Sequence, residues 1–223
     1  EHAARLLQGF SGVLQVDGYA AYKTVRGKRG PDAPLVLAHC WAHGRRQLRE
    51  IFDRDASPIA EEGLRRIARL YEIEAAIKGC PAETRRAVRQ ERSAPLVEAF
   101  GAWLAEARAR VSAKSRIGEK LAYFANHWDG LRVFLEDGRV EMDSNPVENT
   151  IRPLTLNRKN ALFAGHDEGG RSWARIASLV ETCKLNGVDP FAYLKATLEA
   201  IAAGHPASRI DDLLPWNFQP ASS

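Results

Sequence analysis

The chain has 223 residues, 45% of them hydrophobic, and a formal net charge of +4. This length and apolar content suit one sizeable folded core, and we expect that core to carry an insertion. Every apolar stretch falls short of the roughly 20 residues that cross a bilayer, which excludes a membrane-spanning protein and predicts no membrane partner. The chain begins with Glu and lacks a signal-peptide pattern, so we interpret it as part of a longer protein.

The cysteines and the basic residues indicate a compartment and a class of partner. The chain has three cysteines, Cys40, Cys80 and Cys183, which are far apart in sequence. An odd number of widely spaced cysteines predicts free thiols and a cytoplasmic protein. Most of the 32 basic residues are arginine, whose planar guanidinium matches phosphate oxygens. A nucleic-acid partner would explain this excess, and so would a GC-rich genome.

Two short apolar runs near the start predict buried strands. They cover residues 12–16 and 34–38, and both are bounded by turn-forming residues. Residues 19–25 between them could form a short helix, followed by a polar loop. This order predicts a strand, helix, strand unit.

The rest of the chain has a helical pattern. From Trp41 to about Leu135, apolar residues recur at spacings of three and four, with an interruption expected near residues 93–95 and a single helix over 117–135. Residues 143–146 carry a strong helix-start signal. We expect a loop at 165–170, helices at 172–185 and 190–203, and an irregular C-terminal tail.

Asp17 is the first candidate for chemistry. It directly follows the strand at 12–16, where a carboxylate would lie at the edge of a sheet, the usual place for ligands in open sheets. The pair Asp17-Gly18 is also typical of a tight turn that needs no function.

Glu148 is the second candidate, and it also has an ordinary explanation. Asn145 and Pro146 place it at the third position of a helix, which satisfies a capping box. Arg152, four residues later, could form an ion pair with it across one turn. A carboxylate at the beginning of a helix could still face a metal ion, so the two interpretations are compatible.

His39, Cys40 and His43 raise the possibility of a zinc site. A closed tetrahedral site needs a second pair of ligands, and the sequence offers none at a suitable spacing. We therefore interpret Cys40 as a buried strand end, and Arg45 and Arg46 as the basic start of a helix near a phosphate path.

Residues 152–171 are rich in groups that suit phosphate. Arg152, Arg158, Lys159, Asn160 and Arg171 could contact a DNA backbone, and the glycine pair at 169–170 could bring backbone N–H groups to an anion. A charged, solvated surface is the alternative.

Five phrases, in this order, resemble the transposases of the insertion sequence 66 family. The resemblance extends over nearly the whole chain and is strongest from Asp143 onward. The phrases are VDGYAAY (16–22), HCWAHGRRQL (39–48), DSNPVENTIRPLTLNRKNALFAGHDEGG (143–170), KLNGVDPFAYL (184–194) and LLPW (213–216). Ser144 stands where the family often has Asn.

This resemblance implies an α/β fold, mostly α in this chain. A partial ribonuclease-H-like core (1–40) would be followed by an all-helical insertion (41–137), and the remainder of the catalytic core with helical C-terminal elements would occupy 138–223. It also implies an Asp, Asp, Glu triad, with the second Asp at Asp17 and the Glu at Glu148. The first Asp would precede residue 1, so we expect this chain alone to be inactive.

The implied activity is metal-dependent cleavage and strand transfer in DNA transposition. Asp17 and Glu148 would hold Mg²⁺ or Mn²⁺, with Asp143 as a possible helper, and the basic residues named above would hold DNA. The implied partners are the terminal inverted repeats, target DNA, further copies of the protein in a synaptic complex and possible accessory proteins. An inactive DNA-binding remnant and a helical interaction module are the alternative interpretations.

Overall fold

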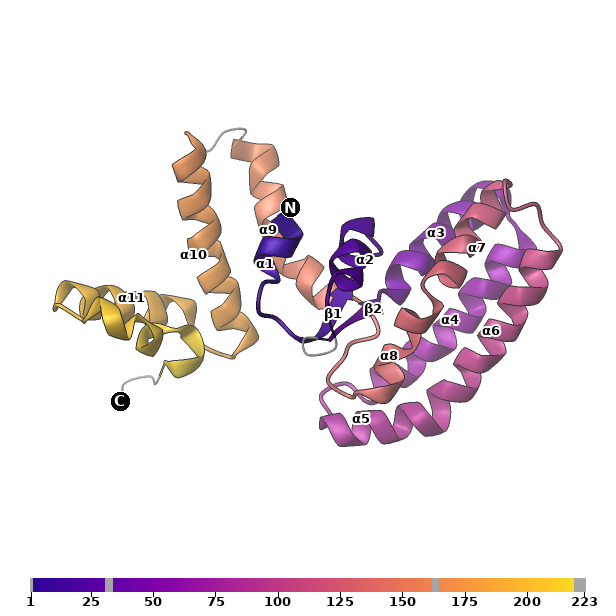
Figure 1. Ribbon diagram of the computed structural model, residues 1–223, viewed down its shortest axis with the longest axis horizontal. Coiled ribbons are helices and arrows are strands. Elements are labelled where there is room, and N and C mark those ends of the chain that lie inside the picture. The colour runs from indigo at the N-terminus through magenta and orange to yellow at the C-terminus, as the bar shows by residue number, and fades with distance from the viewer. Residues whose placement is uncertain (1, 31–33, 162–164, 219–223) are drawn as a thin grey trace. The chain divides into compact units, whose positions relative to one another are not determined.

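The computed structural model describes residues 2–30, 34–161 and 165–218. The chain divides into two compact units, Glu1–Pro146 and Val147–Ser223, and each is described by itself. The described residues are mostly helical, with one small two-stranded sheet in the first unit (Figure 1).

The sheet forms where the sequence predicts it. Strands β1 (Gly12–Val16) and β2 (Leu35–His39) are parallel, with Val16 opposite His39, and helix α2 (Ala20–Gly27) connects them. Buried apolar residues of both strands form a small core of their own, against which side chains from α2 pack. The short helix α1 (His2–Leu6), which the sequence did not predict, packs against α2.

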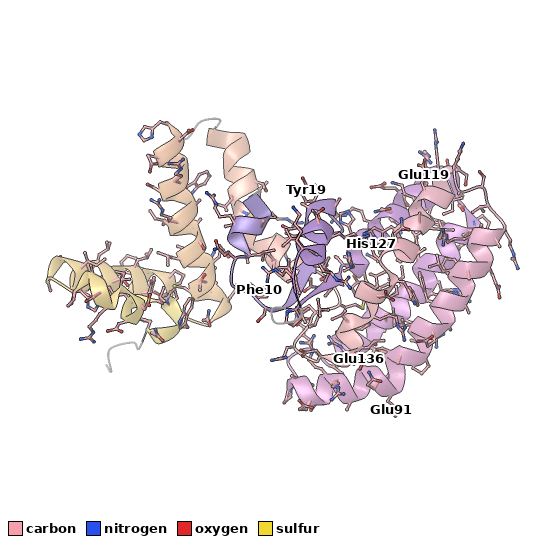
Figure 2. All side chains as sticks on the ribbon, in the orientation of Figure 1. Phe10, Tyr19, Glu91, Glu119, His127 and Glu136 are labelled. Atoms are coloured by element: carbon pink, nitrogen blue, oxygen red, sulfur yellow. The ribbon has the colours of Figure 1, made fainter. Side chains whose placement is uncertain are left out.

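The chain then enters a helical block with a second, larger core. Its elements are α3 (Trp41–Asp55), α4 (Pro58–Ala76), α5 (Ala82–Val88), the π-helix η1 (Arg89–Ser93), α6 (Ala94–Ala109), α7 (Arg116–Asn126) and α8 (Trp128–Glu136). Trp41 is fully buried at its centre, and its indole N–H donates to the carbonyl oxygen of Leu131 over 2.8 Å. Charged side chains such as Glu91 and Glu119 lie on its outer surface (Figure 2).

Two helix boundaries in this block differ from the prediction. The interruption expected near residues 93–95 is a π-helix at Arg89–Ser93, and α6, with Pro95 in its first turn, continues directly from it. The regular α-helical pattern is broken here because a proline has no backbone N–H and its ring clashes with the preceding helical turn. The single helix expected over 117–135 is two helices, which meet at His127, where φ is −122° and ψ is 14°.

Arg89 joins three parts of the helical block. Its guanidinium is fully buried and forms two hydrogen bonds of 2.6 and 2.8 Å with the carboxylate of Glu74 in α4. It also donates to the carbonyl oxygens of Phe134, at the end of α8, and Val140, in the loop that follows. These bonds satisfy backbone groups that would otherwise be buried without a partner.

The second unit contains most of α9 (Asn145–Ala161), then α10 (Asp167–Leu185), α11 (Pro190–Ala202) and the 3₁₀ helices η2 (Ala207–Leu213) and η3 (Pro215–Asn217). The loop predicted at 165–170 ends earlier than expected, because the ring of His166 accepts a hydrogen bond from the backbone N–H of Gly169 and α10 begins at Asp167. The tail was expected to be irregular, and its described part forms 3₁₀ helices over Ala207–Leu213 and Pro215–Asn217. Tyr193 in α11 is buried and donates to the carbonyl oxygen of Leu213, which anchors the 3₁₀ segment.

The α-rich fold with a small sheet is confirmed. The ribonuclease-H-like core stays a prediction, because the residues that the structure describes contain only two strands. The domain boundaries at residues 40 and 137 also stay predictions. Of the helices described, none combines the length and the apolar character needed to cross a bilayer.

We predict that Arg89→Met lowers the free energy of unfolding by about 3 to 5 kcal/mol, because it leaves the Glu74 carboxylate and several carbonyl oxygens buried without a donor. Urea denaturation would measure this. The control Arg92→Met changes an exposed arginine of the same π-helix and should alter stability by less than about 0.5 kcal/mol. Equal stability of the two variants would contradict this role of Arg89.

Candidate functional site

The carboxyl edge of the sheet brings two parts of the candidate site together. Because β1 and β2 are parallel, Asp17 and Cys40 follow their strands at the same edge. The tight turn expected at Asp17-Gly18 is present, since Gly18 has a φ of 105° and Oδ1 of Asp17 accepts a 3.0 Å hydrogen bond from the N–H of Tyr19. The Asp17 carboxylate is exposed, and no described residue forms a hydrogen bond or ion pair with its Oδ2.

The chain returns to this edge after the helical block. The backbone N–H of Trp41 donates to the carbonyl oxygen of Met142 over 3.2 Å, and the backbone N–H of Ser144 donates to Sγ of Cys40 over 3.3 Å. Cys40 is fully buried, so this thiol has a structural role at the end of β2. We call residues 141–145 the return segment.

Two side chains fix the beginning of the return segment. The side-chain amide of Gln15 in β1 donates to the carbonyl oxygen of Glu141 over 2.8 Å. The Glu141 carboxylate accepts two hydrogen bonds, of 2.8 and 2.6 Å, from the guanidinium of Arg85 in α5. The return segment is therefore bonded to both the sheet and the helical block.

Asp143 organises the start of α9. Its Oδ1 accepts a 2.9 Å hydrogen bond from the backbone N–H of Asn145, and its Oδ2 accepts from the Asn145 side chain and from the hydroxyl of Tyr71 in α4, over 2.9 and 3.0 Å. Burial and the neighbouring Asp143 charge raise the pKa of Tyr71 well above its usual range. Both oxygens of Asp143 are thus engaged in holding the helix start.

The second candidate carboxylate lies on the first turn of α9. Glu148 is half-buried and Arg152 is exposed, and both belong to the second unit, whereas Asp17 belongs to the first. The helix start predicted from Asn145 and Pro146 is present, since α9 begins at Asn145.

The predicted DNA-binding residues are distributed over both units. Arg45 and Arg46 are exposed on α3, and the guanidinium of Arg45 lies 5.7 Å from the ring centre of Tyr71. Arg171 is exposed on α10 and forms an ion pair with Glu168. The side chains of Arg158, Lys159 and Asn160 lie outside the described residues.

A pair of histidines next to Asp17 was not predicted as part of the site. The rings of His39, the last residue of β2, and His127, between α7 and α8, lie 4.3 Å apart between centroids. Nδ1 of His127 lies 2.7 Å from the carbonyl oxygen of Tyr123, and its Nε2 would be 3.1 Å from a Cβ at Gly18. His127 therefore packs directly against the residue after Asp17.

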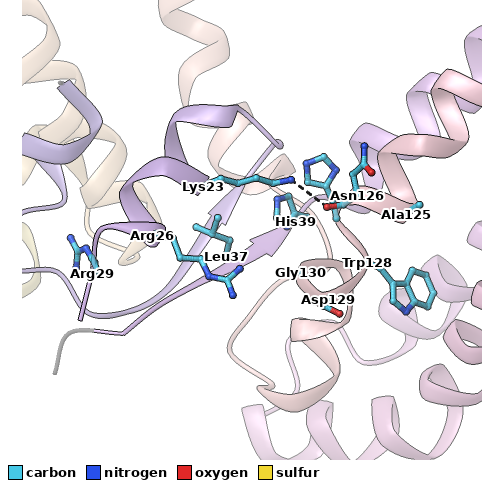
Figure 3. Close-up of a pocket in the computed structure, with 12 residues that line it drawn as sticks. Lys23, Arg26, Arg29, Leu37, His39, Ala125, Asn126, Trp128, Asp129 and Gly130 are labelled. Carbon is cyan, nitrogen blue, oxygen red and sulfur yellow. Dashed lines mark hydrogen bonds between the residues drawn. The ribbon is translucent and has the colours of Figure 1, made fainter. Parts of the chain in front are cut away.

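These histidines line a pocket of about 770 Å³ between α2, β2 and the junction of α7 and α8 (Figure 3). Its polar lining residues include Lys23, Arg26, His39, Asn126, His127 and Asp129. On one side α8 approaches β2 closely, because a Cβ at Gly130 would lie 2.0 Å from Nδ1 of His39 and 2.6 Å from the carbonyl oxygen of Leu37. Burial, followed by the charges of His127, Lys23 and Arg26, lowers the pKa of His39 to about 4.

The segment Asn126 to Gly130 carries the signal that could have found this pocket. Trp128 continues the apolar stripe between Phe124 and Leu131, but Asn126, His127, Asp129 and Gly130 around it are weak helix formers. A break of this kind in an amphipathic helix indicates a junction, and polar residues at a junction often face a site. In the part of the chain that the structure describes, no three His, Cys, Asp or Glu side chains form a group able to hold a metal by themselves.

Comparison with known proteins identifies the family. The model of the IS66 transposase family matches residues 1–172, most of the chain, including the sheet, the helical block, all of α9 and the start of α10. The chain belongs to the IS66 transposase family. A second model, the IS66 C-terminal element, matches residues 178–216 of this family member, which comprise about half of its second unit.

Three proteins of Sinorhizobium fredii (strain NBRC 101917 / NGR234) resemble this IS66 family member. The uncharacterized proteins y4qI and y4jD are 46% and 42% identical to it over 97% of the chain, and y4hP is 37% identical over the whole chain. The chain spans only 41% to 43% of the length of these relatives. No solved structure matches it.

We predict that His39 makes stability depend on pH. Its pKa is about 4 in the folded chain and 6.5 ordinarily, so the unfolded state binds more protons between these values. The stabilisation is complete above pH 6.5 and is lost as the pH falls toward 4, by about 3 kcal/mol at most.

Denaturation at a series of pH values would test this against His39→Asn, which should lose less stability over the same window. His127, whose pKa is also lowered by burial, remains in the variant and keeps part of the dependence. The prediction is wrong if the two proteins lose stability in parallel as the pH falls.

Proposed function

We propose that the protein containing this chain is a transposase that cleaves and joins DNA with divalent metal ions held by Asp17 and Glu148. Support comes mainly from the return segment. Met142 and Ser144 are hydrogen-bonded at the edge of the sheet that Asp17 follows, and α9 begins directly after them at Asn145. The first turn of α9 carries Glu148, so one carboxylate follows a strand and the other follows a loop fixed to the same edge.

The donor set suits Mg²⁺ or Mn²⁺. These ions prefer carboxylate and water oxygens, and the Asp17 carboxylate is exposed, with one oxygen free of hydrogen bonds to any described residue. When bound, such ions activate the attacking water or 3′-hydroxyl and stabilise the leaving oxygen. We propose that a third carboxylate comes from the part of the protein that this chain does not cover, since the chain spans about two fifths of its relatives.

Asp143 has a positioning role in this proposal. Its bonds with Asn145 hold the first residue of α9, and its bond with Tyr71 links that helix start to α4. Because both of its oxygens are engaged, it is a weaker metal ligand than Asp17.

The basic residues would hold the DNA. We propose that Arg45, Arg46, Arg152 and Arg171, with Arg158, Lys159 and Asn160, contact phosphates of the element ends and of the target. Synapsis of two DNA ends would require further copies of the protein, and accessory proteins are a further proposed class of partner. A bacterial transposase of this kind would act in the cytoplasm.

We predict that Glu148→Gln in the full-length protein abolishes strand transfer, by at least about a thousandfold, or roughly 4 kcal/mol in the barrier. DNA binding should persist, because the change removes one charge and keeps the shape of the side chain. Gel assays of cleavage and joining with a labelled element end would measure the reaction, and a mobility shift would measure binding.

The matched control is Glu119→Gln, an exposed carboxylate on the outer surface of the helical block. It should leave both activities unchanged. Strand transfer by Glu148→Gln at the rate of this control would exclude Glu148 from the reaction.

We also predict that chelation with EDTA stops cleavage and that added Mg²⁺ or Mn²⁺ restores it, while binding of the element end continues without metal. Cleavage that persists after exhaustive chelation would rule out the metal-dependent mechanism.

A further inference from the structure

The pocket beside the sheet carries positive charge that the structure does not neutralise. Lys23 and Arg26 extend from α2 on the side of the pocket (Figure 3). Nζ of Lys23 donates to the carbonyl oxygen of Asn126 over 3.3 Å, and no described residue forms an ion pair with Lys23 or Arg26. Arg29 differs, because its guanidinium donates to the carbonyl oxygens of Leu7 and Phe10 and is engaged there.

His39 supplies a second, independent observation. Its side chain lines the pocket and the residue is only 6% exposed, yet neither ring nitrogen has a hydrogen-bond partner among the described residues. A buried polar group without a partner lowers the stability of the folded chain, and such groups are rare in native proteins. A ligand that accepts a hydrogen bond in the pocket would remove this cost.

The pocket adjoins the end of β1. His127, whose ring lies against that of His39 at an interplanar angle of 49°, packs on Gly18, the residue after Asp17. A ligand in the pocket would therefore be separated from the turn at Asp17 by one histidine ring. Asp129 also lines the pocket, but Lys23 and Arg26 outnumber it, so the lining favours an anion.

We infer that this pocket binds a phosphodiester group of the DNA backbone next to the proposed metal site. Lys23 and Arg26 pair with the phosphate charge, and an imidazole N–H of His39 donates to a phosphate oxygen. This assignment rests on the proposed function and adds three residues to the DNA contacts expected from the sequence.

The size of the pocket favours a backbone segment over a single small anion. Ligand pockets usually measure about 300 to 1,000 Å³, and at about 770 Å³ this one exceeds what one phosphate group needs. The space accommodates the sugars on either side of a phosphodiester. Arg26 suits this role because a guanidinium without an ion-pair partner can pair with two phosphate oxygens at once.

Salt dependence of DNA binding tests the assignment directly. Each phosphate that a cation neutralises adds about 0.9 to the slope of log affinity against log salt. We expect the double variant Lys23→Gln, Arg26→Gln of the full-length protein to bind an element-end duplex more weakly, with a slope reduced by about 2. Fluorescence anisotropy between about 50 and 200 mM salt, without divalent metal, would measure it.

The matched control is the double variant Arg65→Gln, Arg132→Gln. It removes the same charge from exposed arginines of the helical block, whose partners are Glu62 and Glu98. Its slope should equal that of the unmodified protein. The inference is overturned if the pocket variant, with an unchanged circular dichroism spectrum, has the slope of this control.

The variant His39→Asn tests whether His39 contributes to DNA binding through a hydrogen bond and not through a charge. Because the low pKa keeps His39 neutral near pH 7, this variant should weaken DNA binding severalfold and leave the salt slope unchanged.

Titration with inorganic phosphate is a second experiment, which distinguishes a DNA site from a site for a small anion. Tight phosphate binding that depends on Lys23 and Arg26, combined with unaltered DNA binding by the double variant, would make this a small-anion site and overturn the DNA assignment.

These outcomes are independent of the proposed chemistry. If Glu148→Gln cleaves normally, the metal-dependent function fails whatever the pocket variants do. If the pocket variants bind DNA normally while Glu148→Gln is inactive, only the pocket assignment fails.

Discussion

The hydrogen bonds between the return segment and the end of β2 are the constraint on which the candidate site depends. The chain leaves the sheet at Trp41, passes through the whole helical block and comes back at Met142, and the bond from the Trp41 N–H to the Met142 carbonyl oxygen closes this excursion. Ser144 and Gln15 reinforce the closure through Cys40 and Glu141. The helical block can therefore be long without displacing the start of α9 from the sheet edge.

The elements that the sequence predicts well are those whose residues carry their own signal. The strands at 12–16 and 35–39 are apolar runs bounded by turns, and α9 begins where a capping pattern appears. The missed features depend on partners elsewhere. The π-helix at Arg89–Ser93 places a buried arginine against Glu74 and the end of α8, and no local pattern reveals those partners.

The residues of the candidate site also fall into those with a local sequence signal and those that depend on distant partners. Asp17 and Asp143 were identified from local motifs, and the structure finds them in a turn and a helix start, as their sequence contexts suggest. Tyr71, which bonds to Asp143 from α4, and the pair His39 and His127 could not be identified in this way, because each acts through a residue distant in sequence. Tertiary packing decides which polar residues gather, and a single sequence does not contain that information.

The approach of α8 to β2 limits how this pocket can diversify. At Gly130 any side chain would collide with the His39 ring and the carbonyl oxygen of Leu37, so that wall has no room for a side chain. On α2, by contrast, Gly27 has no atom within 4 Å of a Cβ placed there. Related proteins that accommodate a differently shaped occupant would have to remodel the α2 wall, so the variation that tunes selectivity should concentrate on one helix.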